Sequence, residues 1–292
     1  MPERRPTIRE RKLAAELRRL RERSTLRLDQ VVAELQTHGA GRWSTPKLSR
    51  IETAAQGIKT SDVNQLCAVY GVPPEKREAL LALTRTARQR GWWDAYADTI
   101  QTDYAAYIEL EAEAKSLRCY NALVLNGLLQ TDEYAHEVIR VGLMQFAPPA
   151  EVDRRVEIRK TRQGLVKDTA SEALRVWSVI DEAALRRIVG SSDIMRRQYA
   201  HLLALSEQPN IMLQVLPFEA GAHPAFSGAF SYMEFPEHHM PDVVYIDGLT
   251  SALYVEDDAQ VHTHLLTFNQ LAMAALGADE SMELISELAE TH

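Results

Sequence analysis

The sequence predicts a multi-domain protein of the α and α+β class. We expect a domain of five helices in residues 1–90, and a mixed α/β domain with a sheet of about five strands in residues 91–292. The chain of 292 residues is long enough for two hydrophobic cores. Apolar residues in the first part recur at helical spacing, whereas short apolar runs bounded by Gly, Pro or Asn in the second part indicate strands.

The overall composition is typical of a soluble globular protein, with 46% hydrophobic and 25% charged residues. No stretch approaches the roughly 18 apolar residues of a membrane-spanning helix, and residues 1–12 lack the apolar core of a secretion signal. Cys67 and Cys119 lie far apart in the sequence, so neither a disulfide framework nor a cysteine-based zinc site is indicated. We therefore expect a cytoplasmic protein that does not associate with membranes.

The charge is unevenly distributed along the chain. Residues 1–90 hold 19 Lys and Arg against 10 Asp and Glu, whereas the remaining residues hold 14 against 31. A basic part joined to an acidic part is typical of a DNA-facing module attached to a domain with a different task. A single solvated basic helix is the alternative, because nine of the cations lie between Arg4 and Arg23.

The first part divides into five helical segments. Apolar residues at intervals of three to five predict a helix over Thr7–Arg23, followed by a second helix over Arg27–Gln36. Residues 44–52 form the third, and Thr60 or Ser61 begins a fourth that extends to Tyr70. The fifth begins at Pro73-Pro74 and extends to about Arg90.

The third segment has two chemically different sides. Leu48 and Ile51 are expected to face the core, Ser44 or Thr45 to cap the helix, and Pro46 to occupy its first turn. Hydroxyl groups and a helix N-terminus suit phosphates, and an Arg can pair bidentately with a guanine edge in the major groove. The side chains expected on the outer side are Ser44, Thr45, Lys47 and Arg50.

Four sequence pieces follow one another in this part: Leu-Arg-Arg-Leu-Arg-Glu (17–22), Leu-Asp-Gln-Val-Val-Ala (28–33), Leu-Ser-Arg-Ile-Glu (48–52) and Leu-Cys-Ala-Val-Tyr-Gly-Val (66–72). In this order they resemble the phage-repressor (XRE) helix-turn-helix family. The resemblance implies that the third helix enters the major groove and that dimers read half-sites about one DNA turn apart.

Carried over by position, the resemblance implies base contacts from Thr45, Pro46 and Arg50, and phosphate contacts from Ser44, Lys47 and Lys59. It also places Gln30 near the DNA backbone at the start of the second helix, and makes Glu52 a charge partner inside the domain.

The turn from Thr37 to Trp43 is longer than the tight turn usual in this family. Arg42 and Trp43 in that turn can contact the DNA backbone, but Trp43 can equally cover the core. Pro46 cannot make the amide contact to a base that is common at its position, so the sequence preference of the family does not transfer.

The second part begins with helices and continues with strands. Helices are expected over Tyr104–Arg118, Asp132–Val141 and Glu151–Lys167, with a loop that includes Val124–Thr131 before the second of them. Strands are expected at Ala173–Ile180, Ile211–Leu216, Gly228–Phe235, Asp242–Asp247 and Ala252–Val255, and further helices at Asp181–Val189, Asp193–Ser206, Ala259–Leu276 and Ser281–Glu290.

Five short motifs occur in order in this part: Leu-Leu-Gln-Thr-Asp-Glu-Tyr-Ala (128–135), Arg-Lys-Thr-Arg-Gln (159–163), Ile-Asp-Glu-Ala-Ala-Leu-Arg (180–186), Val-Leu-Pro-Phe (215–218) and Val-Val-Tyr-Ile-Asp (243–247). Together they are similar to a C-terminal domain of uncharacterised function that follows the same helix-turn-helix in many actinobacterial transcriptional regulators. Such regulators are often described as antitoxin-like, and some pair with a small protein encoded nearby. The resemblance implies a regulator without naming what it senses.

We found no sequence signature of catalysis or of a metal site. A nucleophile elbow, a Gly-rich phosphate loop and a Ser-His-Asp grouping are all missing at usable spacing. His238 and His239 are adjacent in a loop and point apart, and His262 and His264 do not share a helix face. Asp181 follows a strand and is explained as a helix cap. We therefore expect no enzymatic activity, no cofactor and no metal.

The sequence leaves three functions open. The first is a repressor or autoregulator that binds a double-stranded DNA operator as a homodimer and responds through residues 91–292 to a small molecule or a protein partner. The second is an antitoxin-like protein that binds a small co-encoded partner there, and a DNA-associated enzyme is the third. Candidate effector contacts are aromatic or imidazole side chains, each of which can instead be structural: Trp92, Trp177, His223, Phe226 and Tyr245.

Overall fold

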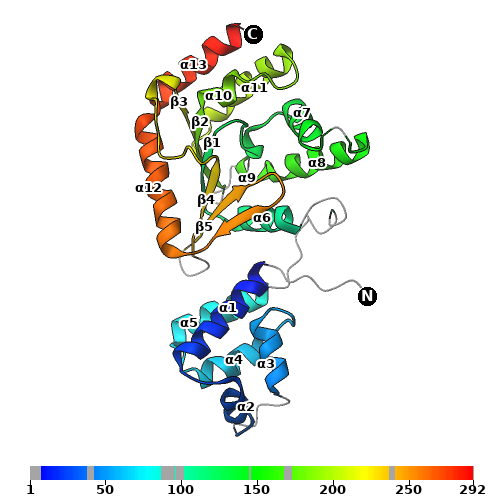
Figure 1. Cartoon of the computed structure of the whole chain (residues 1–292), viewed down its shortest axis with the longest axis vertical. Helices are drawn as coiled ribbons and strands as arrows, with labels where there is room; N and C mark the ends of the chain where they lie inside the picture. Colours follow the sequence, from blue (N-terminus) through cyan, green and yellow to red (C-terminus); the bar gives the residue numbers. More distant parts are fainter. Residues whose placement is uncertain are drawn as a thin grey trace. The chain divides into compact units, whose positions relative to one another are not determined.

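The computed structural model describes residues 8–37, 43–86, 96, 102–144, 146–167, 173–236 and 241–291 (Figure 1). The chain divides into two compact units, Met1–Trp92 and Trp93–His292, which are described separately below. None of the helices in these described ranges is both long and apolar enough to cross a membrane.

The described part of the first unit forms the five predicted helices. They are α1 (Ile8–Arg23), α2 (Leu28–Thr37), α3 (Thr45–Glu52), α4 (Thr60–Val69) and α5 (Pro74–Thr86). Their apolar stripes meet in one core that includes Leu17, Val31, Leu48 and Leu66, each fully buried.

The α4 helix ends where the sequence supplies a glycine. Gly71 has φ +63°, the left-handed conformation that favours glycine. The N–H of Val72 donates to the carbonyl of Cys67 at 2.9 Å and that of Gly71 to the carbonyl of Ala68 at 3.3 Å. This pattern is a Schellman motif, and it directs the chain into α5.

The second unit packs helices on a mixed sheet, as predicted. Its helical elements are α6 (Thr102–Glu113), η2 (Gly127–Leu129), α7 (Asp132–Gly142), α8 (Pro149–Arg162), α9 (Gly164–Lys167), α10 (Glu182–Arg186), α11 (Ser192–Ser206), η3 (Phe218–Ala220), α12 (Asp258–Ala274) and α13 (Ala278–Thr291). Its strands are β1 (Ser116–Asn121), β2 (Arg175–Asp181), β3 (Ile211–Leu216), β4 (Phe230–Glu234), β5 (Val243–Asp247) and β6 (Ala252–Val255).

The six strands of the described residues follow the order β3-β2-β1-β4-β5-β6. Strands β1, β2 and β3 are parallel, and β4, β5 and β6 continue the sheet in antiparallel pairs on the other side of β1. One face carries α12, whose Phe268 and Leu271 pack on Tyr120, Val179 and Val244. Figure 1 shows α12 on one side of the sheet and α7, α8, α10 and α11 on the other.

The predicted helix over Tyr104–Arg118 is wrong in its last five residues. Helix α6 ends at Glu113, and Ser116–Asn121 form β1, a strand inside the sheet. The spacing of Leu110, Ala114 and Leu117 suits a helix, but β1 pairs with β2 on one side and β4 on the other. Those two ladders of hydrogen bonds outweigh the local preference.

The loop between β1 and α7 is held by glutamine side chains from two helices. Gln163 of α8 donates to the carbonyls of Gly127 and Gln130 at 3.1 and 2.7 Å. Gln198 of α11 donates to the carbonyl of Leu129 at 2.7 Å and accepts from the N–H of Thr131 at 2.8 Å. Two of the motifs noted in the sequence, residues 128–135 and 159–163, therefore contact each other.

Both cysteines are buried, one in each unit. Cys67 lies in the core of the first unit and Cys119 on the central strand β1, and each is 1% exposed. Burial raises the pKa of both thiols, that of Cys119 to about 11. At neutral pH these side chains therefore remain protonated and unreactive while the structure is closed.

Candidate nucleic-acid interface

The local sequence sets the start and the inner side of α3. Ser44 is the N-cap, and its hydroxyl oxygen accepts a hydrogen bond from the Lys47 N–H at 3.3 Å. Pro46 occupies the first turn, where a missing N–H leaves no bond unmade. Leu48 and Ile51, 0% and 2% exposed, fix the helix on the core.

An ion pair joins the end of α3 to α1. Glu52 is 7% exposed, and its carboxylate accepts from the Arg21 guanidinium at 2.8 Å (Nε to Oε1) and 2.9 Å (Nη2 to Oε2). The predicted role of Glu52 as an internal charge partner is confirmed. Hydrogen bonding to Glu52 raises the pKa of Arg21, so this guanidinium stays charged and holds the end of α3 on α1.

The outer side of α3 is available for contact. Ser44, Thr45, Pro46 and Arg50 are all exposed. Within the described residues the Arg50 guanidinium has neither a hydrogen-bond nor an ion-pair partner, so its five donors are free for a ligand. A helix that presents hydroxyls at its N-terminus and an unpaired Arg two turns or less away can contact phosphate and a base edge together.

Lys47 lies differently from Arg50. Its ammonium is 3.0 Å from Oδ2 of Asp62 in α4 and 3.9 Å from the centre of the Trp43 ring, and its side chain is only 22% exposed. Lys47 thus connects α3 to its neighbours, and a phosphate contact would have to compete with Asp62 for the same ammonium group.

Trp43 belongs to the core of the first unit. Its side chain is 4% exposed, and its indole N–H donates to Oε1 of Gln65 at 2.9 Å. Of the two roles that the sequence left open, the structure selects the packing one. Arg42, the other predicted contact in this turn, lies outside the described residues.

Two further predicted contacts are exposed on the first unit. Gln30 lies in the first turn of α2, where its Oε1 accepts from the Arg27 N–H at 2.8 Å and so completes the helix start. Lys59 is the N-cap residue of α4, and its side chain is exposed next to the α3–α4 connection.

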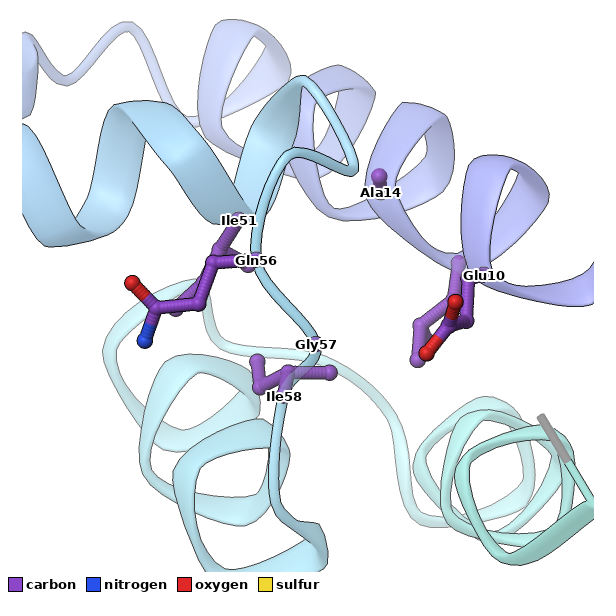
Figure 2. Close-up of a pocket in the computed structure, with 7 residues that line it drawn as sticks. Glu10, Ala14, Ile51, Gln56, Gly57 and Ile58 are labelled. Atoms are coloured by element: carbon purple, nitrogen blue, oxygen red, sulfur yellow. The ribbon is translucent and has the colours of Figure 1, made fainter. Parts of the chain in front are cut away.

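A small cavity lies behind α3, shown in Figure 2, and its volume is about 10 Å³. It is lined by Glu10, Leu13 and Ala14 of α1 and by Ile51, Gln56, Gly57 and Ile58. A space of that size holds about one water molecule. It therefore belongs to the packing of α1 on α3 and does not accommodate a larger ligand.

The candidate effector residues of the second unit do not form one site. Trp177 packs edge-on against Phe268 under α12, with 5.2 Å between ring centres, and donates to Oε1 of Gln214 at 2.8 Å. Tyr245 contacts Tyr107 of α6 at 4.4 Å, on the opposite face of the sheet. Trp92 lies outside the described residues.

His223 and Phe226 do lie together, near the carboxyl ends of β1 and β2, with 4.6 Å between ring centres. Nε2 of His223 is 3.3 Å from the Tyr120 hydroxyl, which donates to Oδ2 of Asp181 at 2.8 Å. Burial, followed by the bond to Asp181, raises the pKa of Tyr120. Sequence reasoning misses Tyr120 because the residues of β1 lack the alternating pattern of a strand.

Asp181 has a second role at the start of α10. Its Oδ1 accepts from the Ala183 N–H at 2.9 Å, which confirms the predicted helix cap. Among the residues that the structure describes, no group of three or more His, Cys, Asp and Glu side chains is arranged to hold a metal ion. His238 and His239 lie outside those residues.

Comparison with known families gives two matches. Residues 12–80 match a family described as Helix-turn-helix domain, and residues 104–287 match a family described as Domain of unknown function (DUF5753). The first match begins in α1 and ends in α5, and the second, more than half of the chain, begins in α6 and ends in α13. No curated protein and no solved structure matches the chain.

Proposed function

Because the chain belongs to the family described as Domain of unknown function (DUF5753) and carries a helix-turn-helix DNA-binding domain, we propose that it is a sequence-specific transcription regulator of the phage-repressor type. In this proposal α3 is the recognition helix. The second unit receives the signal that controls DNA binding.

The observation that supports the recognition role is the division of α3 into two sides. Leu48, Ile51 and Glu52 are buried, and the last of these is tied to Arg21. Thr45 and Arg50 are exposed, and the Arg50 guanidinium is unpaired within the described residues. A rigid helix with a free guanidinium suits bidentate contact to O6 and N7 of a guanine.

A homodimer on a near-palindromic operator follows from the size of this helix. The eight residues of α3 reach only a few base pairs, and two copies one DNA turn apart give useful specificity. We propose that such a dimer represses transcription, including that of its own gene. Reporter transcription from the selected operator, with and without the protein, distinguishes repression from activation.

The DNA-binding proposal is tested by selecting bound sequences from a random DNA pool and then replacing Arg50. Arg50→Ala is expected to weaken operator binding by about 1–3 kcal/mol and to relax specificity at one base pair. The measurement is a titration of labelled operator and of single-base variants at fixed salt, because affinity for DNA depends strongly on salt.

The matched control is Arg85→Ala, which removes the same charge from an exposed position near the end of α5. It is expected to change affinity slightly and equally for all sequences. Unchanged operator affinity and specificity in Arg50→Ala would show that α3 is not the recognition helix.

We propose that the second unit controls DNA binding by responding to a small molecule. Its acidic character suits a role other than contact with DNA, since residues 91–292 hold 31 Asp and Glu against 14 Lys and Arg. A ligand that binds only the folded protein raises its free energy of unfolding with the logarithm of the ligand concentration once the site is saturated. Thermal unfolding in the presence of candidate metabolites therefore tests this response.

A protein partner is the second candidate, in which case the chain acts as an antitoxin-like member of a two-protein module. The end of α7 and its connection to α8 carry three exposed apolar side chains: Val141 at 57%, Met144 at 72% and Phe146 at 86%. Clustered exposed apolar groups often mark protein contacts. Co-purification with the product of a neighbouring small gene, lost in Phe146→Ser, favours this candidate.

A further inference from the structure

A groove of about 330 Å³ lies at the beginning of β1, β2 and β3. Because these strands are parallel, their first residues lie side by side at the same end of the sheet. Ser116 is opposite Arg175, and Arg118 is opposite Trp177, which is in turn opposite Met212. Side chains that are opposite in register lie on the same face, so these residues line the groove together.

The groove is cationic although the unit around it is acidic. Arg118 and Arg175 line it, and Lys115 lies beside it. Among the described residues that line it, Glu234 is the single acidic one, and Oε2 of Glu234 already accepts from the Ser116 hydroxyl at 2.6 Å. Three of the 14 cations in residues 91–292 therefore lie in or beside this groove.

The two arginines keep donors for a ligand. Nη2 of Arg118 is 4.0 Å from Glu234, beyond hydrogen-bond distance, and Lys115 is equally far from it. Arg175 is exposed, and within the described part of the chain its guanidinium has no ion-pair partner. Arg118 and Arg175 occupy diagonal positions on the same face of the neighbouring parallel strands β1 and β2, so both guanidinium groups can reach one anionic group.

The rest of the groove is apolar. Trp177 supplies a fixed aromatic surface, because Phe268 packs against its ring and Gln214 accepts from its indole N–H. Met212 is 48% exposed and adaptable, and Ile211 and Pro209 complete the wall. Small-molecule sites combine such an apolar surface with a few polar groups, and the volume lies within their usual range of roughly 300–1,000 Å³.

We propose that this groove binds a small organic anion, such as an aromatic carboxylate. The anionic group lies between Arg118 and Arg175, and the flat apolar part lies on Trp177 and Met212. The proposal names the ligand class for the effector response proposed above and rests on it for its regulatory meaning. Binding itself is measured without DNA, so the two proposals fail separately.

The test is equilibrium dialysis of the full-length protein with 2-naphthoate, and with the neutral 2-naphthamide as the matched probe, at constant ionic strength. We expect 2-naphthoate to bind about tenfold or more tightly than 2-naphthamide, since a charge-assisted contact to Arg is worth at least that factor. Arg118→Gln and Arg175→Gln are each expected to remove that preference.

The control variant is Arg197→Gln, which removes one exposed arginine from α11 of the same unit, outside the groove. It is expected to leave 2-naphthoate binding unchanged. Arg175 is exposed, so its variant stays informative if Arg118→Gln fails to fold. Equal binding of the two probes, or unchanged binding in Arg175→Gln, would overturn the proposal. Operator selection with the same protein preparation tests DNA binding separately, so a failure of one proposal is distinguished from a failure of the other.

Discussion

Glu111 and Arg162 form an ion pair inside the second unit. Their side chains are 0% and 3% exposed, and two parallel hydrogen bonds of 2.7 Å join the guanidinium to the carboxylate. Tyr104 accepts a further hydrogen bond from Arg162, and the Tyr107 ring lies 5.0 Å from the guanidinium carbon. The pair connects α6 to α8 with every charge compensated, despite the cost of removing both groups from water.

Breaking this pair on one side is expected to be costly. Arg162→Met leaves the Glu111 carboxylate buried without its partner, and we expect the free energy of unfolding to fall by about 3–5 kcal/mol. Urea denaturation followed by circular dichroism measures the change. The control is Lys160→Met, which removes an exposed cation of α8 that pairs with Asp132. A loss no larger than in the control would contradict the role assigned to the buried pair.

For single residues, the sequence was enough to predict which side chains of α3 point outward. It was not enough to predict which groups the cations of α3 pair with. Helical spacing alone places Leu48 and Ile51 inside and Arg50 outside. Nothing in the spacing shows that the Lys47 ammonium meets Asp62, because that contact depends on how α4 packs against α3. Trp43 follows a turn of unusual length, so its burial also became clear only in three dimensions.

Among the elements, β1 is the one that the local sequence does not predict. Ser116–Asn121 contains no Val, Ile or Thr and follows a helix without a strong break, so its local signal is helical. Its place in the middle of the sheet is decided by long-range pairing with β2 and β4. The groove was missed for the same reason, since Arg118 joins Arg175 only when Ser116–Asn121 is a strand.

The loop between β1 and α7 gives a prediction at the level of elements. Gln163 is 4% exposed and satisfies two carbonyls of that loop, those of Gly127 and Gln130. In Gln163→Ala both carbonyls lose this donor, and we expect the free energy of unfolding to fall by about 1–3 kcal/mol. Thermal and urea unfolding measure it, with Gln260→Ala at an exposed position of α12 as the matched control. Equal stability of the two variants would show that the hydrogen bonds from Gln163 to this loop do not stabilise the fold.

For the whole molecule, the two-unit organisation was predictable because each part has its own apolar pattern and its own charge. It also bears on stability measurements. Each unit has a separate core, so unfolding need not follow a single two-state transition. Unfolding should therefore be followed with probes that report on one unit at a time.

The pH dependence of stability is expected to include a contribution from His201 of α11. Burial, and then the charge of Lys167, lower its pKa below the usual 6.5. The folded state then binds fewer protons than the unfolded state, so this contribution is complete above pH 6.5 and is lost as the pH falls through the folded pKa. Urea denaturation at a series of pH values should show a smaller acid loss in His201→Gln than in the exposed control His262→Gln. Identical profiles would exclude this contribution.

Each unit buries one cysteine, so the rate at which a reagent labels that cysteine reports how often its unit opens. A maleimide can reach Cys67 only when the first unit opens and Cys119 only when the second unit opens. Operator DNA should slow labelling of Cys67 in proportion to its saturation, and 2-naphthoate should slow that of Cys119. Mass spectrometry of the labelled peptides separates the two rates. If DNA slows Cys119 as well, the logarithm of the ratio of its labelling rates without and with DNA gives the free energy that couples the two units.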